Sequence, residues 1–336
     1  MARTVVCFGE MLMRLSPPAG KPLSRATALD MHFGGAEANV AVALASLGTP
    51  ARMLTALPDN APGHGAKAAL GAAGVDTRHV PFSPGRLGLY FLEPPAGPRA
   101  GQVTYDRAGS AFSLASPSQF AFDDALQDAS LLHVSGITPA LGPAGVALAR
   151  AAIAAAKAAG VPISFDGNYR GNLWQSWDSD PRAILHGLVA DATILFGNHR
   201  DLSLLLGREI PGDAPERRRK AAEAAFAEFP RLALLASTDR LVVDAGHHRL
   251  SARVDTRDDS WQADELPVSG IIDRIGSGDA FAAGVLHRHL AGAPLRSVAE
   301  TGLVLAALKH GVSGDSIAAS EAELAAFRPD GADVRR

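Results

Sequence analysis

The chain has 336 residues, of which 47% are apolar and 20% are charged, and its formal net charge is −3. This composition is typical of a globular protein with a substantial core, and the weak negative charge argues against nucleic acid or an anionic membrane as a partner. Cys7 is the only cysteine, so no internal disulfide can form. The N-terminus lacks the pattern of a signal peptide and no apolar run is long enough for a bilayer, so we expect a cytoplasmic protein.

Strand-like and helix-like segments alternate along the chain. The expected strands cover 4–12, 51–59, 130–136, 161–168, 192–198, 232–238 and 240–246. The expected helices cover 37–48, 64–74, 143–160 and most of the chain after Gly278. Several of the strands are continuous apolar runs, which are typical of strands buried on both faces. The alternation therefore predicts βα units and a mainly parallel sheet between helices.

The stretch YFLEPPAGPRAGQVTYDRAG (90–109) interrupts this alternation. Two strand-like arms flank a turn rich in proline and glycine, which predicts a β-hairpin. With residues 28–35, the hairpin is expected to form a small β lid, built from about 10–35 and 86–110, over one edge of the main sheet. Exposed strand edges favour pairing between chains, so we expect a homo-oligomer, a dimer or higher.

The stretch IGSGDAFAAGVL (275–286) places a glycine-rich loop directly before an apolar helix. Amides at a helix start are unpaired and carry partial positive charge, and glycines let a phosphate approach them closely. Asp279 lies in the first turn, where a carboxylate would repel phosphate unless it has a function. It can accept the proton of a hydroxyl that attacks a phosphoryl group. The alternative is a tight turn with Asp279 as a helix cap.

Residues DRIGSGD (273–279) resemble the D-T-x-G-A-G-D signature of the ribokinase-like (PfkB) carbohydrate kinases, with Arg274 and Ser277 as departures. FGGAEANVAVALASLG (33–48) is similar to the N-terminal signature of that family. The resemblance implies that Asp279 is the catalytic base and that the loop amides stabilise the developing charge. It also implies a sugar site. The implied catalytic loop residues are Gly276, Ser277 and Gly278, and the implied sugar-facing residues are Gly34, Gly35 and Asn39.

Two further segments resemble the nucleotide site of the family. GNHRD (197–201) is similar to N-x-x-E, which implies that Asn198 binds the nucleotide and that Asp201 acts on magnesium through water or phosphate. A helix N-terminal cluster is the alternative. LLASTDR (234–240) lies where the family holds adenosine, which implies contacts from Ser237 and Thr238. His310 is expected either to line the adenine pocket or to interact with a helix dipole. The implied cofactors are ATP and Mg²⁺, and some members also use K⁺ near the Asp273 loop.

Five stretches resemble the 2-keto-3-deoxygluconate kinase branch: 9–18, 86–93, 104–112, 165–174 and 309–315. This branch implies transfer of the γ-phosphoryl group of ATP to the terminal hydroxyl of 2-keto-3-deoxygluconate, which gives 2-keto-3-deoxy-6-phosphogluconate. The implied fold is a ribokinase-like three-layer α/β/α sandwich. We expect one domain over 1–330, including the lid, and a tail over 331–336.

A sugar-acid substrate calls for a group that binds carboxylate, and guanidinium does so with two parallel hydrogen bonds. Arg107 and Arg170 are the candidates by resemblance, with hydroxyl contacts from Tyr90 and Tyr105 and with Asp315 at the sugar end. Surface ion pairs and, for Asp315, a loop-capping role are the alternatives. Rival functions are a kinase of 2-keto-3-deoxygalactonate, fructose or ribose, a nucleoside kinase, and a sugar-acid sensor without turnover. The sequence favours neither 2-keto-3-deoxygluconate nor its galactonate epimer as the substrate.

Overall fold

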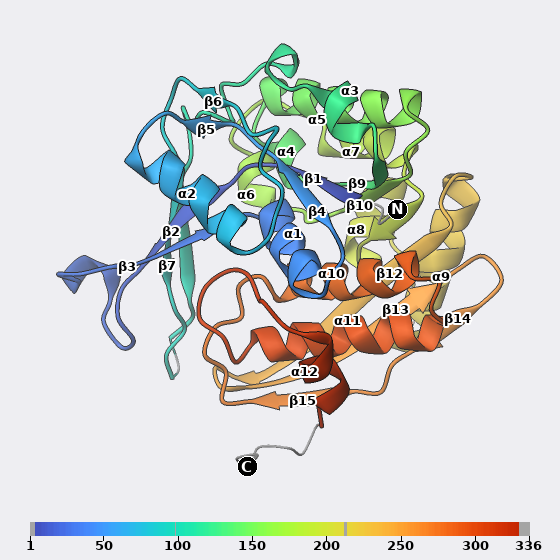
Figure 1. Ribbon diagram of the computed structural model, residues 1–336. Coiled ribbons are helices and arrows are strands. Elements are labelled where there is room, and N and C mark those ends of the chain that lie inside the picture. The colour runs from blue at the N-terminus through green and yellow to red at the C-terminus, as the bar shows by residue number, and fades with distance from the viewer. Residues whose placement is uncertain (1–3, 98, 212–213, 329–336) are drawn as a thin grey trace.

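A computed structural model, which describes residues 4–97, 99–211 and 214–328, confirms the predicted α/β architecture (Figure 1). In the main sheet β4, β1, β9, β10, β11 and β12 run parallel in that order, and β13, β14 and β15 add an antiparallel end. Its strands are β1 (Thr4–Phe8), β4 (Ala51–Leu54), β9 (Ala129–Ser135), β10 (Ile163–Asp166), β11 (Ile194–Phe196), β12 (Leu234–Asp244), β13 (His247–Asp255), β14 (Ser260–Gln262) and β15 (Leu266–Ser269).

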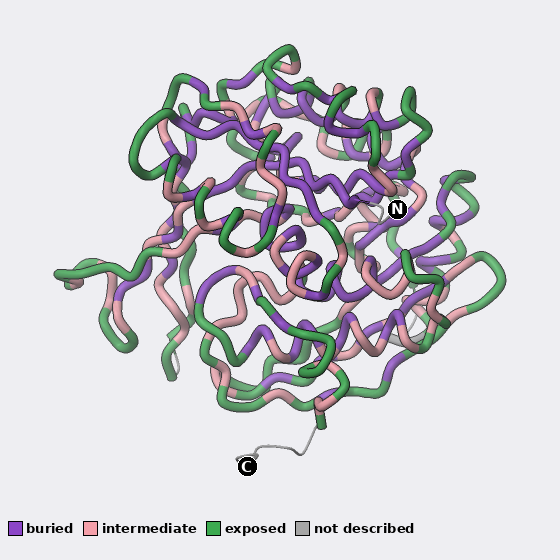
Figure 2. Tube along the Cα trace, in the orientation of Figure 1, coloured by how far each residue is buried: buried purple, intermediate pink, exposed green. Residues whose placement is uncertain are grey.

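Helices cover both faces of this sheet, so its central strands are buried (Figure 2). In β1, Val5 and Cys7 join one core with α1, α10 and α11, and Val6 and Phe8 join the other with α5, α7 and α8. The helices are α1 (Ala36–Ser46), α2 (Ala61–Ala72), α3 (Phe122–Leu126), α4 (Ile137–Ala140), α5 (Pro143–Ala158), α6 (Gly171–Trp174), α7 (Pro181–Val189), α8 (His199–Leu206), α9 (Ala214–Glu228), α10 (Ser277–Leu290), α11 (Leu295–Lys309) and α12 (Glu321–Ala326).

A second sheet of four strands projects from one side of the molecule (Figure 1). The strand order is β3 (Asp30–Gly34), β2 (Leu12–Ser16), β7 (Gly88–Glu93) and β8 (Gln102–Asp106). The hairpin expected over 90–109 is confirmed, because β7 and β8 pair antiparallel with Tyr90 opposite Tyr105. One face of this lid sheet is buried through Leu12, Arg14 and Tyr90. A short pair, β5 (Leu57–Pro58) with β6 (Phe82–Ser83), forms a third sheet.

Two strand predictions were wrong in detail. The strand expected over 4–12 ends at Phe8 as β1, and its last residue, Leu12, instead begins β2 of the second sheet. Gly9 lies between the two strands, where a Cβ would be 2.0 Å from Oε2 of Glu37. The strands expected over 232–238 and 240–246 are instead one strand, β12, because the segment between them stays extended and pairs with β13.

The predicted tail over 331–336 lies outside the described residues. Within the described part of the chain, no helix combines the length and apolar character that crossing a membrane requires.

Candidate active site

A cavity of about 660 Å³ lies between the carboxyl ends of β10 and β11, the middle of β12, the start of α10 and the lid sheet. This is the edge of a parallel sheet at which α/β proteins bind their ligands. Every predicted site residue except Gly34 lines the cavity. Gly34 supports it from behind, because a Cβ there would be 2.3 Å from Oδ2 of Asp315.

The glycine loop forms the N-terminus of α10, as predicted. Gly276 is the N-cap residue and has a left-handed φ of 81°. A Cβ at this position would lie 1.7 Å from the carbonyl oxygen of Asp315, so only glycine fits. A Cβ at Gly278 would meet nothing within 4 Å, because this residue faces open space. The amide of Ser277 donates to the carbonyl of Arg274 over 3.3 Å. The next two amides of the first turn, those of Gly278 and Asp279, have no backbone partner among the described residues and are available to an anion.

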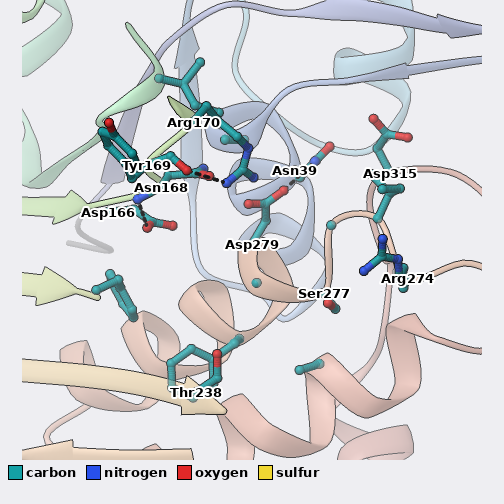
Figure 3. Close-up of a pocket in the computed structure, with 18 of the residues that line it drawn as sticks. Asn39, Asp166, Asn168, Tyr169, Arg170, Thr238, Arg274, Ser277, Asp279 and Asp315 are labelled. Atoms are coloured by element: carbon teal, nitrogen blue, oxygen red, sulfur yellow. Dashed lines mark hydrogen bonds between the residues drawn. The ribbon is translucent and has the colours of Figure 1, made fainter. Parts of the chain in front are cut away.

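Asp279 and Asn39 connect the two family signatures, which lie far apart in the sequence. Nδ2 of Asn39 donates to Oδ2 of Asp279 over 2.6 Å (Figure 3). Burial raises the pKa of Asp279 to about 6, and the bond from Asn39 and the charge of Arg170 oppose that rise. No side chain caps α10, so the alternative role of Asp279 as a helix cap is not observed. Its carboxylate is instead positioned to accept a proton in the cavity.

Further carboxyl groups surround Asp279. Burial, followed by the charges of Asp279 and Asp201, raises the pKa of Asp166 to about 8. Burial also raises the pKa of Asp201, and it raises that of Glu37 to about 7. The side chain of Arg170 points toward Asp279 (Figure 3), and its charge lowers the pKa of Asp166, Asp201 and Asp279.

The two predicted carboxylate-binding arginines differ in their surroundings. Nε of Arg107 donates to Oε2 of Glu10 over 2.8 Å, Nη2 contacts the same oxygen, and Ser110 binds the other. Both members of this pair are buried, so the charge of Arg107 is balanced inside the protein. Arg170 is exposed to the cavity, and among the described residues its side chain has only the carbonyl of Tyr169 as a partner, at 3.3 Å.

Asp315 is held by residues of the lid. The hydroxyl of Tyr90 donates to Oδ2, and Nη1 of Arg14 lies 3.0 Å from Oδ1. Arg14 also pairs with Asp273 over 2.7 Å. Tyr105 is partly exposed, and its ring packs against Tyr90 and Arg107. The lid is thus attached by buried ion pairs to the loops beside Gly276.

The half of the cavity beside α8 and β12, where the sequence predicts the nucleotide, contains the other predicted residues. Asn198 and Asp201 form a capping box on α8, in agreement with the alternative proposed from sequence, and both also line the cavity. Ser237 and Thr238 lie on β12. His310 is buried and donates through Nδ1 to the carbonyl of Ala306 over 2.7 Å. Burial lowers its pKa, which favours a neutral imidazole with Nε2 as an acceptor and argues against a charged dipole partner.

This half is also rich in unpaired positive charge. Arg200, Arg240 and Arg274 line the cavity, and none of them forms an ion pair with another residue in the described ranges. Guanidinium groups without carboxylate partners are suited to a polyphosphate. Arg274 lies beside Ser277 (Figure 3), at the position where it departs from the family signature.

A match to a known protein family shows which family the chain belongs to. The sequence profile of the pfkB family carbohydrate kinases matches residues 2–322. The chain belongs to the pfkB carbohydrate kinase family. Among the relatives of this kinase is the 2-dehydro-3-deoxygalactonokinase of Haloferax volcanii, with 35% identity over 94% of this chain and 93% of the relative. The 2-dehydro-3-deoxygluconokinase of Thermoproteus tenax is 28% identical over 93% of this chain and 90% of that protein.

Solved structures agree with the family assignment. The crystal structure of 2-dehydro-3-deoxygluconokinase from Thermotoga maritima superposes on this kinase with a TM-score of 0.92 and 32% identity, and it covers 97% of this chain and 98% of the other. The ribokinase-like fold expected from the resemblance is confirmed.

The sequence did not identify all of the charged residues at the site. Glu10, Arg14, Glu37 and Asp166 were not assigned roles, although all but Arg14 line the cavity. Asp166 carried a usable signal, since it ends a buried strand at the carboxyl edge of the sheet. Arg14 carried another, because it alternates with apolar residues on a half-buried strand.

Proposed function

We propose that this kinase transfers the γ-phosphoryl group of ATP to the terminal hydroxyl of 2-keto-3-deoxygluconate (also named 2-dehydro-3-deoxygluconate). The contact between Asn39 and Asp279 carries the proposal, because it brings a sugar-facing signature to the catalytic loop in one cavity. Asp279 accepts the hydroxyl proton as the new O–P bond forms. The bond between the γ-phosphorus and the bridging oxygen breaks, and ADP leaves with that electron pair.

The amides of Gly276 to Gly278 stabilise the charge that develops on the transferred group. No group of three acidic, histidine or cysteine ligands suited to a metal occurs among the described residues, so a magnesium ion would arrive with the nucleotide, and Asp201 would hold one of its waters. When bound, such an ion would neutralise part of the charge of the phosphates. Asn198, Ser237, Thr238 and His310 are proposed to bind the nucleotide because they line its half of the cavity.

The substrate class is inferred from Arg170. An unpaired guanidinium at the cavity wall favours a ligand with a carboxylate and gives no advantage with fructose or ribose. Arg107 is proposed as a second contact through Nη1, which its ion pair with Glu10 leaves available. Hydroxyl contacts are proposed for Tyr105. The galactonate epimer is the second candidate, because a relative named as a galactonokinase shares 35% identity with the chain.

The test measures ADP release with ATP and Mg²⁺ across 2-keto-3-deoxygluconate, its galactonate epimer, fructose, ribose and adenosine. A kcat/KM that is highest for 2-keto-3-deoxygluconate supports the proposal. A higher value for the epimer would reassign the substrate within the sugar acids. Release with only a neutral sugar or a nucleoside would refute the argument from Arg170. ATP binding without turnover of any compound would favour the sensor.

We also propose that the kinase is a homo-oligomer, a dimer or higher. Both edges of the lid sheet are open, and β8 is exposed along its length. Met31 on β3 is apolar and exposed by 56%. Light scattering of the purified protein tests the proposal, and a mass equal to that of one chain would refute it.

A further inference from the structure

Lys309 is a fully buried lysine that the reaction scheme above does not use. It is the last residue of α11 and has 0% exposure. Its ammonium donates to the carbonyl oxygen of Val312 over 2.9 Å and to that of Asp273 over 3.3 Å. Within the described ranges it forms no ion pair with a carboxylate. A buried ammonium that faces only two backbone carbonyls is costly for a residue that only packs, so its position points to a function.

The two carbonyls belong to different loops. Asp273 begins the loop that leads to the catalytic glycines, and Val312 lies in the loop that leads to Asp315. These loops touch where Gly276 meets the carbonyl of Asp315. Lys309 thus joins them beneath the phosphate-binding turn, and a shift of either loop would move the amides of that turn.

Nearby carboxylates offset part of the cost of burying this ammonium. Burial lowers the pKa of Lys309, and the charges of Asp273, Asp315 and Asp279 act against this decrease. Arg14 is the other buried cation of the cluster and pairs directly with Asp273 and Asp315. Lys309 adds a second positive charge without a direct carboxylate contact, as a bound monovalent ion would.

Backbone carbonyls that converge on one point are the usual ligands of potassium, because they replace its hydration shell. Here the ammonium of Lys309 fills the space between the carbonyls of Asp273 and Val312. The carboxylate of Asp273 is also occupied. Its Oδ1 accepts from the amide of Ile275 at 3.0 Å, and its Oδ2 accepts from the amide of Gly314 at 3.1 Å. A potassium ion between these two loops does not fit the residues present.

We propose that Lys309 is a built-in monovalent cation, a positioning residue that fixes the catalytic loop, so that phosphoryl transfer by this kinase needs no potassium ion at this place. The proposal rests on the proposed function only where turnover is measured. Nucleotide affinity provides a second readout, because the same loop would hold the phosphates of ATP.

The test compares the wild-type kinase with Lys309→Ala in buffers of equal ionic strength that contain choline, potassium, ammonium or methylammonium chloride. For the wild type we expect the same kcat and the same calorimetric Kd for ATP in every salt. For Lys309→Ala in choline we expect a loss in kcat of about 10–100-fold, typical of residues that orient a catalytic group. Potassium, ammonium or methylammonium should restore part of the lost kcat and ATP affinity in this variant alone.

Lys157→Ala is the matched control, because this lysine forms an ion pair with Asp191 on the surface. It should behave as the wild type in every salt. Activation of the wild type by potassium, or tighter ATP binding by the wild type in potassium, would overturn the proposal even if Lys309→Ala fails to fold. A folded Lys309→Ala that keeps full turnover in choline, or that no cation restores, would also overturn it. If no sugar is turned over, the proposed function fails and the ATP affinities still decide the role of Lys309.

Discussion

The pairing of Arg107 with Glu10 predicts that the two cavity arginines fail in different ways when each is replaced by alanine. The side chains of Arg107 and Glu10 are only 8% and 1% exposed. Removing one member of a buried pair leaves an uncompensated charge and costs about 3–5 kcal/mol of stability. Arg107→Ala should therefore lower the Tm by about 5–10 °C. The double variant Glu10→Gln/Arg107→Met should lose less stability than Arg107→Ala, because no buried charge stays unpaired.

Arg170→Ala removes a guanidinium that has no ion-pair partner among the described residues, so its Tm should stay close to that of the wild type. The loss of a charge-assisted hydrogen bond to the substrate carboxylate should raise the KM for the sugar acid about 10–100-fold. Calorimetric melting and steady-state kinetics on the same preparations separate the two effects. A normal Tm for Arg107→Ala, or a normal KM for Arg170→Ala, would refute the corresponding half of this reasoning.

Three further predictions concern the catalytic loop. Asp279→Asn should lower kcat by about 10²–10⁴-fold while calorimetry still detects binding of ATP and the sugar acid, and near-normal turnover would remove Asp279 as the base. Since a base must be ionised and the pKa of Asp279 is raised to about 6, kcat/KM should fall as the pH decreases through about 6. A fall only near the ordinary aspartate value of about 4 would contradict this assignment. Gly276→Ala should lower kcat by about 10²-fold, because its Cβ would clash with the backbone of Asp315. Gly292→Ala, with a similar φ of 71° and open space around it, should cost only stability.

The parts of the fold that the sequence predicts are those with local signals. The run ISF before Asp166 carries no charged residue, as is typical of a strand buried on both faces, and it forms β10. The glycines and Asp279 at the start of an apolar helix are a local signal for an anion site, and they form the N-terminus of α10. The end of β1 is less clear from the sequence. Gly9 and Glu10 interrupt the apolar run, but they do not indicate that the chain then enters a different sheet, which depends on the pairing of β2 with β3 and β7.

The partners of charged side chains are harder to predict than their positions. The motifs placed Arg107 and Arg170 at the cavity correctly, but Glu10 pairs with Arg107 from 97 residues away. Arg14 similarly joins a lid strand to Asp273 and Asp315 at the far end of the chain. Such pairs depend on the register and packing of separate elements, so neither composition nor spacing indicates them.

These partners determine what the cavity can bind. Two free arginines in the sugar half would favour a ligand with two negative charges, such as a sugar phosphate. In the structure Glu10 neutralises Arg107, so Arg170 is the one cavity arginine in the described sugar half that lacks an ion pair. One unpaired guanidinium matches a ligand with one carboxylate, since a second negative charge would stay without a partner beside Asp166 and Asp279. A preference for a sugar monoacid would therefore depend on the buried Glu10 as much as on either arginine.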